Sequence, residues 1–128
     1  MKIPLATRYA DYDNKSHVNN AVYLTYFEIA RAHVWREVLG LPDDPAFVLA
    51  EATVRYLSPA MLGEPLEIEI RTGEIRTKAW VWEYAIRCTA DGRTIAEGST
   101  VQVWFDYERR VAAKIPEAVA ATLRGLRD

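Results

Sequence analysis

The chain has 128 residues and is 50% hydrophobic, so it is long enough to form a single domain, residues 1–128, with a sizeable core. Its 16 basic and 18 acidic residues leave a net charge of −2, which argues against binding to nucleic acid or to an anionic membrane. The chain has a single cysteine, Cys88, which excludes an internal disulfide and a multi-cysteine metal site. Cys88 falls in the apolar register of a predicted strand, so we expect a buried, inert thiol.

The N-terminal part of the chain predicts a short strand, a polar loop and a long helix, in that order. We expect the strand at residues 3–10 and the helix at residues 21–39. Asn19 or Asn20 would be the N-cap of this helix, and Gly40 would end it. Apolar residues cover more than one side, a pattern typical of a helix buried by more than one neighbour. One apolar face consists of Tyr23, Phe27, Ala30, Val34 and Val38, and a second of Val22, Ile29, Ala32, Trp35 and Leu39.

Strand patterns dominate the rest of the chain, after a predicted loop at residues 42–45. Apolar residues alternate with polar ones, as in a sheet that has one face in water. Gly73 interrupts the alternation and predicts a bulge, and the dipeptide Asp91-Gly92 predicts a hairpin turn. Pro116 suits the first turn of a terminal helix. The predicted strands are residues 46–58, 66–71, 80–88 and 95–105, and the terminal helix is residues 116–126.

The element order is therefore β-α-β-β-β-β with a short C-terminal helix, which places the protein in the α+β class. The connections after the long helix have hairpin length, so we expect an antiparallel sheet curved around that helix. Trp80, Trp82 and Trp104 present more aromatic surface than one small layer readily covers, which predicts an oligomer. The alternative is that these tryptophans all face the helix.

The polar loop before the long helix carries the most informative chemistry. Asp11, Asp13, His17, Asn19 and Asn20 lie within ten residues that run directly into the helix. Acids and amides in a loop can be ordinary turn residues, because they hydrogen-bond to nearby backbone. However, a carboxylate beside the first turn of a helix also lies near free N–H groups that can stabilise a negative oxygen. A base next to an oxyanion site suits acyl-transfer chemistry.

A set of short motifs follows in order along nearly the whole chain. They are Arg8-Tyr9, Asp11-Tyr12-Asp13, His17-Val18-Asn19-Asn20-Ala21, Tyr23-Leu24, Tyr26-Phe27-Glu28-x-Ala30-Arg31, Tyr56-Leu57-Ser58-Pro59 and Gly63-Glu64. Together they resemble the hotdog-fold thioesterases, in particular the 4-hydroxybenzoyl-CoA thioesterase-like branch of short bacterial acyl-CoA hydrolases. Plant fatty acyl carrier-protein thioesterases have a similar Asp-x-x-x-His-Val-Asn-Asn run. The resemblance implies an antiparallel sheet wrapped around one central helix, and a homodimer or homotetramer.

The resemblance also implies roles for individual residues. Asp13 corresponds to the catalytic aspartate, as general base or nucleophile, and a backbone N–H near Asn20 to the oxyanion donor; no metal or cofactor is implied. His17 would orient Asp13, contact the thioester, or only hydrogen-bond to loop backbone. We also expect Tyr23 to contact the substrate. Two positions depart from the family pattern. Ser16 stands where many relatives have glycine, which adopts a positive φ more easily than serine does. Lys15 stands where the plant enzymes have a catalytic asparagine.

Six further residues are candidates for substrate contacts. Glu51 is an acid in an otherwise apolar strand, and it would serve as a second carboxylate of the site or as an ion-pair partner of Arg55. The phosphates of coenzyme A need positive charge near the pocket. Arg76 and Lys78 flank a predicted turn and are the first candidates for this contact, followed by Arg55, Arg109 and Arg110.

Glu28 and Arg31 lie three residues apart on the long helix and would form an ion pair.

Because no apolar stretch suits a signal peptide or a membrane span, we expect a cytoplasmic protein.

The residues therefore predict an acyl-CoA thioesterase. A non-catalytic acyl-CoA binding module is the main alternative, and an enoyl-thioester hydratase is less favoured because its loop pattern is not found.

Overall fold

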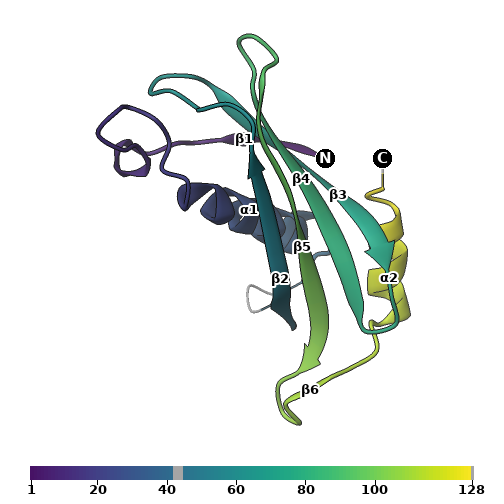
Figure 1. The fold of residues 1–128 in the computed structure, drawn as a ribbon. Coiled ribbons are helices and arrows are strands. Elements are labelled where there is room, and N and C mark those ends of the chain that lie inside the picture. The colour runs from purple at the N-terminus through teal and green to yellow at the C-terminus, as the bar shows by residue number, and fades with distance from the viewer. Residues whose placement is uncertain (42–44, 128) are drawn as a thin grey trace.

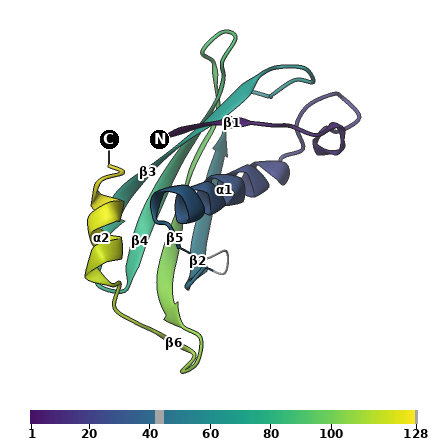
Figure 2. The same cartoon turned by 180° about the vertical axis from the view of Figure 1, so that it is seen from behind.

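One antiparallel sheet forms most of the protein, and a long helix lies across one of its faces (Figures 1 and 2). The computed structural model describes residues 1–41 and 45–127, so most of the predicted 42–45 loop lies outside the described residues. The strands pair in the spatial order β1-β3-β4-β5-β2, and a short β6 pairs with the end of β5. Their bounds are β1 Lys2–Leu5, β2 Phe47–Tyr56, β3 Leu66–Ile75, β4 Ala79–Cys88, β5 Thr94–Asp106 and β6 Val111–Ala112.

The helices match the predicted order and refine its boundaries. A 3₁₀ turn, η1 (Tyr9–Asp11), precedes α1 (Val22–His33), and α1 continues as a π-helical segment, η2 (Val34–Val38). The short α2 (Glu117–Arg124) lies beside β3 at the sheet edge away from β2 (Figure 1). A sheet curled around one long helix is the hotdog fold, as the sequence resemblance implied. Among the described residues, none of the helices has both the length and the apolar character needed to cross a membrane.

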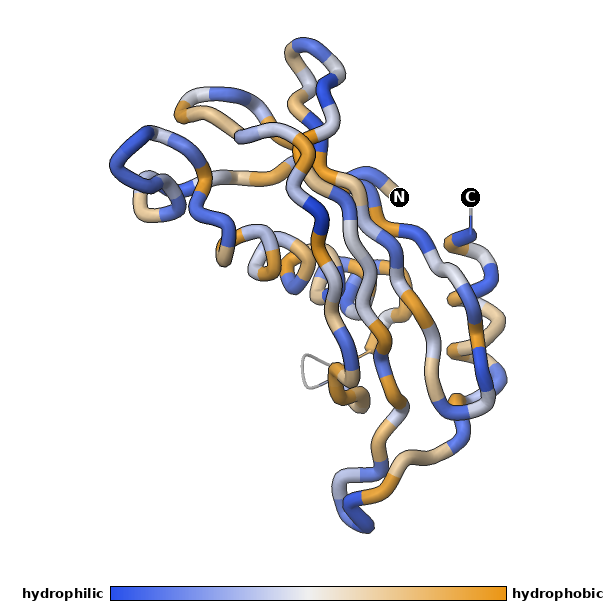
Figure 3. Tube along the Cα trace, viewed as in Figure 1, coloured by the Kyte–Doolittle hydropathy of each residue, from blue (hydrophilic) through white to orange (hydrophobic). Residues whose placement is uncertain are grey.

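The inner face of α1 packs onto the middle strands of the sheet. Phe27 is fully buried and stacks on Tyr84 of β4, with ring centroids 4.2 Å apart. Gly98 of β5 allows this approach, because a Cβ atom there would lie 2.6 Å from the Phe27 ring. Along the strands, hydrophobic and hydrophilic residues alternate, so that one face meets the helix and the other faces outward (Figure 3).

The tryptophans do not support the argument for an oligomer. Trp80 and Trp82 are fully buried within a single chain, with their rings edge to face at 5.4 Å. Trp104 is partly buried and contacts Trp35, which follows α1. The alternative, in which the tryptophans face the helix, is what the structure has. An oligomer stays a prediction, but these side chains give no ground for it.

Two boundaries also differ from the sequence prediction. The first strand ends at Leu5 rather than at residue 10, because Arg8 and Asp11 form a capping box around η1. The residue before α1 is Ala21, which cannot cap through its side chain. The predicted cap is therefore wrong for both Asn19 and Asn20. Asn19 Oδ1 instead accepts the Ala21 N–H at 3.0 Å, in the turn that precedes the helix.

Other local predictions are confirmed. The register of β3 shifts between Thr72 and Ile75, which is the bulge predicted at Gly73. Gly92 has φ +75° in the turn between β4 and β5, and the Cys88 thiol is buried. Ser16 adopts φ +61°, the conformation for which many relatives use glycine.

The outer side of α1 is not covered within one chain. Leu24 and Ile29 are 41% and 43% exposed, so the expectation that several neighbours bury the helix is not met by a single subunit. The adjacent edge strand, β2, is likewise mostly exposed.

Candidate active site

The loop between β1 and α1 is held to the helix by one buried carboxylate. Asp11 is 1% exposed and accepts hydrogen bonds from the Arg8 backbone, the Arg8 guanidinium and the Tyr26 hydroxyl of α1. Burial alone would raise the pKa of the Asp11 carboxyl, but these hydrogen bonds outweigh it and lower the pKa below its ordinary value. The Asp11 carbonyl accepts the Asn19 N–H at 2.8 Å, which closes the loop.

Asp13 lies at the tip of this closed loop, with its side chain in solvent. Its Oδ1 accepts the backbone N–H groups of Lys15 at 2.9 Å and His17 at 3.1 Å. These two backbone hydrogen bonds lower the pKa of Asp13, so the carboxylate is ionised at neutral pH. The bonds fix its orientation, and within the described part of the chain no donor reaches Oδ2. One carboxylate oxygen is therefore available for chemistry.

His17 supports Asp13 through its backbone. Besides its N–H, its carbonyl accepts the Asp13 N–H at 2.7 Å. Across residues 1–41 and 45–127 the imidazole ring has no hydrogen-bond partner, although it lines the same cavity as Asp13. Orientation of Asp13 was one of the roles predicted for His17, and the main-chain atoms of His17 perform it.

A surface cavity of about 420 Å³ joins Asp13 to the start of α1. Besides Asp13 and His17, its lining includes Asn20, the buried Tyr23 of α1 and Tyr56 at the end of β2. Carboxylate, helix start and aromatic walls therefore meet in one hollow. A hollow that combines a few polar groups with aromatic side chains is typical of a small-molecule site.

The first residues before α1 are fixed by two side chains. Asn19 Oδ1 accepts the Ala21 N–H, and the Tyr56 hydroxyl donates to the Asn20 carbonyl at 2.9 Å. No acceptor among the described residues takes the Asn20 N–H, which lies just before the N-cap Ala21, beside the unsatisfied N–H groups of the helix start. Such donors carry the positive end of the helix dipole and can bind an oxyanion.

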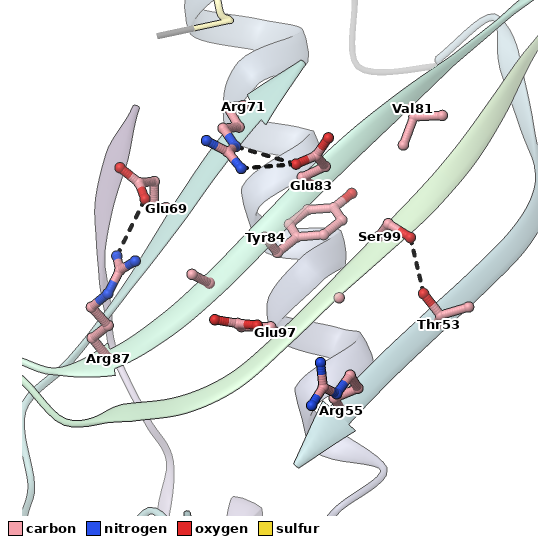
Figure 4. A pocket seen from close by; sticks show the side chains of 12 residues that line it. Thr53, Arg55, Glu69, Arg71, Val81, Glu83, Tyr84, Arg87, Glu97 and Ser99 are labelled. Carbon is pink, nitrogen blue, oxygen red and sulfur yellow. Dashed lines mark hydrogen bonds and ion pairs between the residues drawn. The ribbon is translucent and has the colours of Figure 1, made fainter. Parts of the chain in front are cut away.

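The other predicted substrate residues lie elsewhere. Glu51 and Arg55 are exposed on β2 and do not pair with each other, so the ion pair considered for them is absent within one chain. Arg55 borders a hollow of about 500 Å³ on the outer face of the sheet, opposite α1 (Figure 4). Arg76 and Lys78 occupy the β3–β4 turn, at the end of the sheet away from the Asp13 loop (Figure 1). None of the four shares the cavity with Asp13.

The ion pair predicted between Glu28 and Arg31 does not form either. Arg31 is 8% exposed, because its side chain runs beneath α1, and its guanidinium donates to the Tyr84 hydroxyl at 3.4 Å. Glu28 points to the exposed side of the helix, so helical spacing alone did not bring the two charges together.

Sequence reasoning missed several contributors. Tyr56, Asp11 and Tyr26 all belong to the family motifs, but only the three-dimensional structure shows that Tyr26 donates to Asp11 and Tyr56 to the Asn20 carbonyl. Lys114 and Arg127 join Arg76 around a hollow of about 380 Å³ beside α2. These basic residues lie far apart in the sequence, so no local pattern could indicate that they meet.

A group of potential metal ligands, Glu64, Cys88 and Asp91, also comes together in the structure. Its charge is already compensated, because Arg93 donates to both oxygens of Glu64 at 2.7 and 2.9 Å and to Asp91 at 2.6 Å. The hydrogen bonds from Arg93 lower the pKa of Glu64. A guanidinium thus takes the position that a cation would need.

The fold and this site define a class of protein. The sequence profile of the thioesterase-like superfamily matches residues 7–123, and the chain belongs to that superfamily. Over 126 residues it is 25% identical to acyl-CoA thioester hydrolase YbgC of Escherichia coli O157:H7, covering 94% of this chain and 93% of that protein.

Two further relatives extend the comparison. The acyl-acyl carrier protein thioesterase ATL3 of Arabidopsis thaliana is 26% identical over 124 residues, which span 92% of this chain and 64% of ATL3. The crystal structure of a Thermus thermophilus thioesterase complexed with coenzyme A and Zn is 30% identical, with a TM-score of 0.84. The similarity covers 98% of this chain and 92% of that one.

Proposed function

We propose that this protein is an acyl-CoA thioesterase, which hydrolyses the thioester to a carboxylic acid and free coenzyme A. One observation carries the proposal: Asp13 lines the same cavity as Asn20, whose N–H has no acceptor among the described residues. Thioester hydrolysis needs these two groups, a base or nucleophile at the carbonyl carbon and a donor for the oxygen.

In the proposed reaction, the thioester carbonyl oxygen lies against the Asn20 N–H. Asp13 takes a proton from water as the water oxygen bonds to the carbonyl carbon, or its own oxygen attacks that carbon first. The negative charge that forms on the carbonyl oxygen is stabilised by the N–H, a contact worth about 2.7–4 kcal/mol in other enzymes. The carbon–sulfur bond then breaks and coenzyme A leaves as a thiolate, which takes a proton from protonated Asp13 in the first route and from solvent in the second. In the second route, water afterwards hydrolyses the acyl-aspartate.

The choice of thioester rests on the relatives. The E. coli relative is named an acyl-CoA thioester hydrolase, the T. thermophilus structure holds coenzyme A, and the Arabidopsis relative is named for acyl carrier protein. We infer coenzyme A as the carrier because the first two cover most of their own lengths in the alignment. A thiol-release assay with aliphatic and aromatic acyl-CoA and acyl carrier protein thioesters tests this choice. Turnover of the carrier-protein substrates alone would reassign it.

We also propose that the protein assembles as a homodimer, or as a homotetramer of two such dimers. In one chain the basic β3–β4 turn lies at the far end of the sheet from Asp13. In an antiparallel dimer, joined edge to edge, the partner's sheet is reversed. Arg76 and Lys78 of the partner subunit would then lie at the same end as Asp13, where the phosphates of coenzyme A would reach them. This placement explains how residues remote in one chain could serve one substrate.

A non-catalytic acyl-CoA binding module is the second candidate. The observation that favours it is the full solvation of Asp13 in the single chain, since catalytic carboxylates are often desolvated. The thiol-release assay separates the two functions when it is paired with a binding measurement on the same acyl-CoA. Tight binding without thiol release across the whole panel would establish the binding module.

A further inference from the structure

Three hollows lie one after another between α1 and β2. The first is the Asp13 cavity, at the start of the helix and the end of the strand. The second, of about 190 Å³, lies beside the middle of both elements, and the third, of about 310 Å³, lies between η2 and the start of the strand. In this order, the helix and the strand contribute to the walls Tyr23 and Tyr56, Leu24 and Ala52, and Trp35 and Phe47. A ligand bound at Asp13 therefore has room to extend beside α1.

Arg31 lines both hollows beyond the Asp13 cavity, and its charge is buried. The residue is only 8% exposed. Among residues 1–41 and 45–127, no acidic side chain forms an ion pair with its guanidinium, and the acceptor that it reaches is the Tyr84 hydroxyl at 3.4 Å. A guanidinium removed from water is stabilised when an anion replaces the lost hydration. In the described part of the chain, Arg31 is thus a buried cation without an anion.

The hydrogen bonds beneath Arg31 do not supply that anion. The Tyr84 hydroxyl, which accepts from Arg31, lies 2.6 Å from the Thr100 hydroxyl, and Thr100 donates to the side-chain carbonyl of Gln102. The Gln102 amide then donates to the Trp80 carbonyl at 3.2 Å. Every acceptor in this chain is neutral, and each donor is directed away from Arg31. The hollows are therefore the side from which an anion can reach the guanidinium.

We infer that Arg31 binds a carboxylate at the far end of the acyl group, so that the preferred substrates are thioesters of dicarboxylic acids. This inference rests on the proposed thioesterase function and names its substrate class. The planar guanidinium suits a carboxylate, because two parallel N–H groups can donate to its two oxygens. The methylene groups between the two ends would contact the apolar side chains of the second hollow, Leu24, Leu49 and Ala52.

The spacing along the helix sets the length of this acyl group. A rise of about 1.5 Å per residue separates Asn20 from Arg31 by about 16 Å along the helix axis. The Arg31 side chain shortens this interval, because long side chains on a helix lean toward its N-terminus. An extended chain advances about 1.2 Å per bond, so an acyl group of roughly 8 to 12 carbons spans the interval.

Glu28 is an acid that borders the same two hollows. Its side chain is exposed on the outer side of α1, where water and salt screen its charge. The charge of Arg31 is buried and is screened less, so the two together still favour an anion. Glu28 should nevertheless weaken the binding of a carboxylate. The inference therefore predicts effects of opposite sign when the two charges are removed one at a time.

Two thioethers of coenzyme A that cannot be hydrolysed test the inference. One carries a decyl chain, and the other carries a chain of the same length that ends in a carboxylate. Calorimetry with the wild type should show tighter binding of the carboxylated thioether, on the order of tenfold, as a hydrogen-bonded ion pair contributes. The same preference should appear in kcat/KM for the corresponding thioesters.

Arg31→Gln should abolish this preference, and Arg31→Lys should keep only part of it, because the ammonium lacks the forked geometry. Glu28→Gln should increase the preference several-fold. Arg87→Gln is the matched control for Arg31→Gln, because Arg87 is on the outer face of the sheet, and its preference should equal that of the wild type. Thermal unfolding shows whether Arg31→Gln is folded. Glu28→Gln changes an exposed side chain, so it tests the inference even if Arg31→Gln does not fold.

Equal binding of the two thioethers to the wild type would overturn the inference. An unchanged preference in folded Arg31→Gln, or a reduced one in Glu28→Gln, would overturn it as well. The binding ratio does not depend on thiol release. A protein that shows the preference but hydrolyses no thioester would therefore contradict only the proposed function, whereas an active thioesterase without the preference would contradict only this inference.

Discussion

The Tyr26 hydroxyl of α1 donates to the buried Asp11 carboxylate at 3.0 Å. The helix that begins beside the candidate active site therefore also holds the loop that carries Asp13. Loss of this bond should therefore alter the position of Asp13, two residues after Asp11, although Tyr26 itself does not line the cavity.

Tyr26→Phe removes this hydrogen bond and leaves the ring in place. A hydrogen bond to a charged group contributes about 1.5–3 kcal/mol, and we expect the free energy of unfolding to fall by that amount. Tyr107→Phe is a matched control, because the Tyr107 hydroxyl donates to a carbonyl at an exposed site. Urea unfolding of both variants gives the comparison. Equal stability of Tyr26→Phe and wild type would show that the bond does not hold the loop.

The Asp11 carboxylate also predicts how stability depends on pH. Its folded-state pKa is lowered, so its contribution is complete above the ordinary carboxyl pKa of about 4 and is lost as pH falls through the folded-state value. Asp11→Asn should therefore lower the free energy of unfolding at neutral pH and flatten its decrease in acid. Urea titrations between about pH 2 and 7 measure this. Parallel curves for the variant and wild type would contradict the assignment.

Tyr56→Phe tests the support of the oxyanion donor. The lost hydrogen bond holds the Asn20 carbonyl, and therefore the backbone at the start of α1. We expect kcat to fall several-fold with little change in stability, because Tyr56 is 47% exposed. The measurement is steady-state thioester hydrolysis alongside thermal unfolding. A changed melting temperature with normal kcat would make Tyr56 a structural residue only.

Arg76→Ala/Lys78→Ala tests the proposed phosphate contacts. Exposed contacts between charges are screened by salt, so KM for acyl-CoA should rise with ionic strength in the wild type while kcat changes little. The double variant should have a higher KM and a weaker salt dependence. The same measurement on Arg109→Ala/Arg110→Ala, the other basic pair considered for the phosphates, in the exposed turn after β5, shows whether the effect is specific to the β3–β4 turn. An unchanged KM in the first variant would place the nucleotide elsewhere, with the basic hollow around Lys114 as the next site to test.

Local patterns in the sequence predicted much of the fold. The bulge at Gly73, the turn at Asp91-Gly92 and the burial of Cys88 each depend on residues close together in the chain, and each is confirmed. Ser16 was noted only as a departure from the family's glycine, and the structure shows that it keeps a positive φ all the same. In these places the backbone requirement and the residue type are directly linked.

What the sequence did not predict depends on strand order. The order β1-β3-β4-β5-β2 makes β2 an edge, although it is the first strand after the helix, and this explains why Glu51 and Arg55 are exposed. The bulge after Leu49 then changes which face they share. For Trp80 and Trp82, alternation showed which face they take but not that α1 and η2 would cover it. The two apolar faces of α1 predicted burial by more than one neighbour, but a single chain leaves Ile29 of the second face exposed.

The most direct test of the proposed activity is the turnover of Asp13→Asn. The substitution keeps the size of the side chain, and an amide oxygen can still accept the N–H groups of Lys15 and His17. We expect unchanged binding of coenzyme A and a loss of kcat by roughly two to four orders of magnitude, the scale of a positioned base. Wild-type turnover in Asp13→Asn, on every thioester that the wild type hydrolyses, would show that Asp13 is not the catalytic carboxylate.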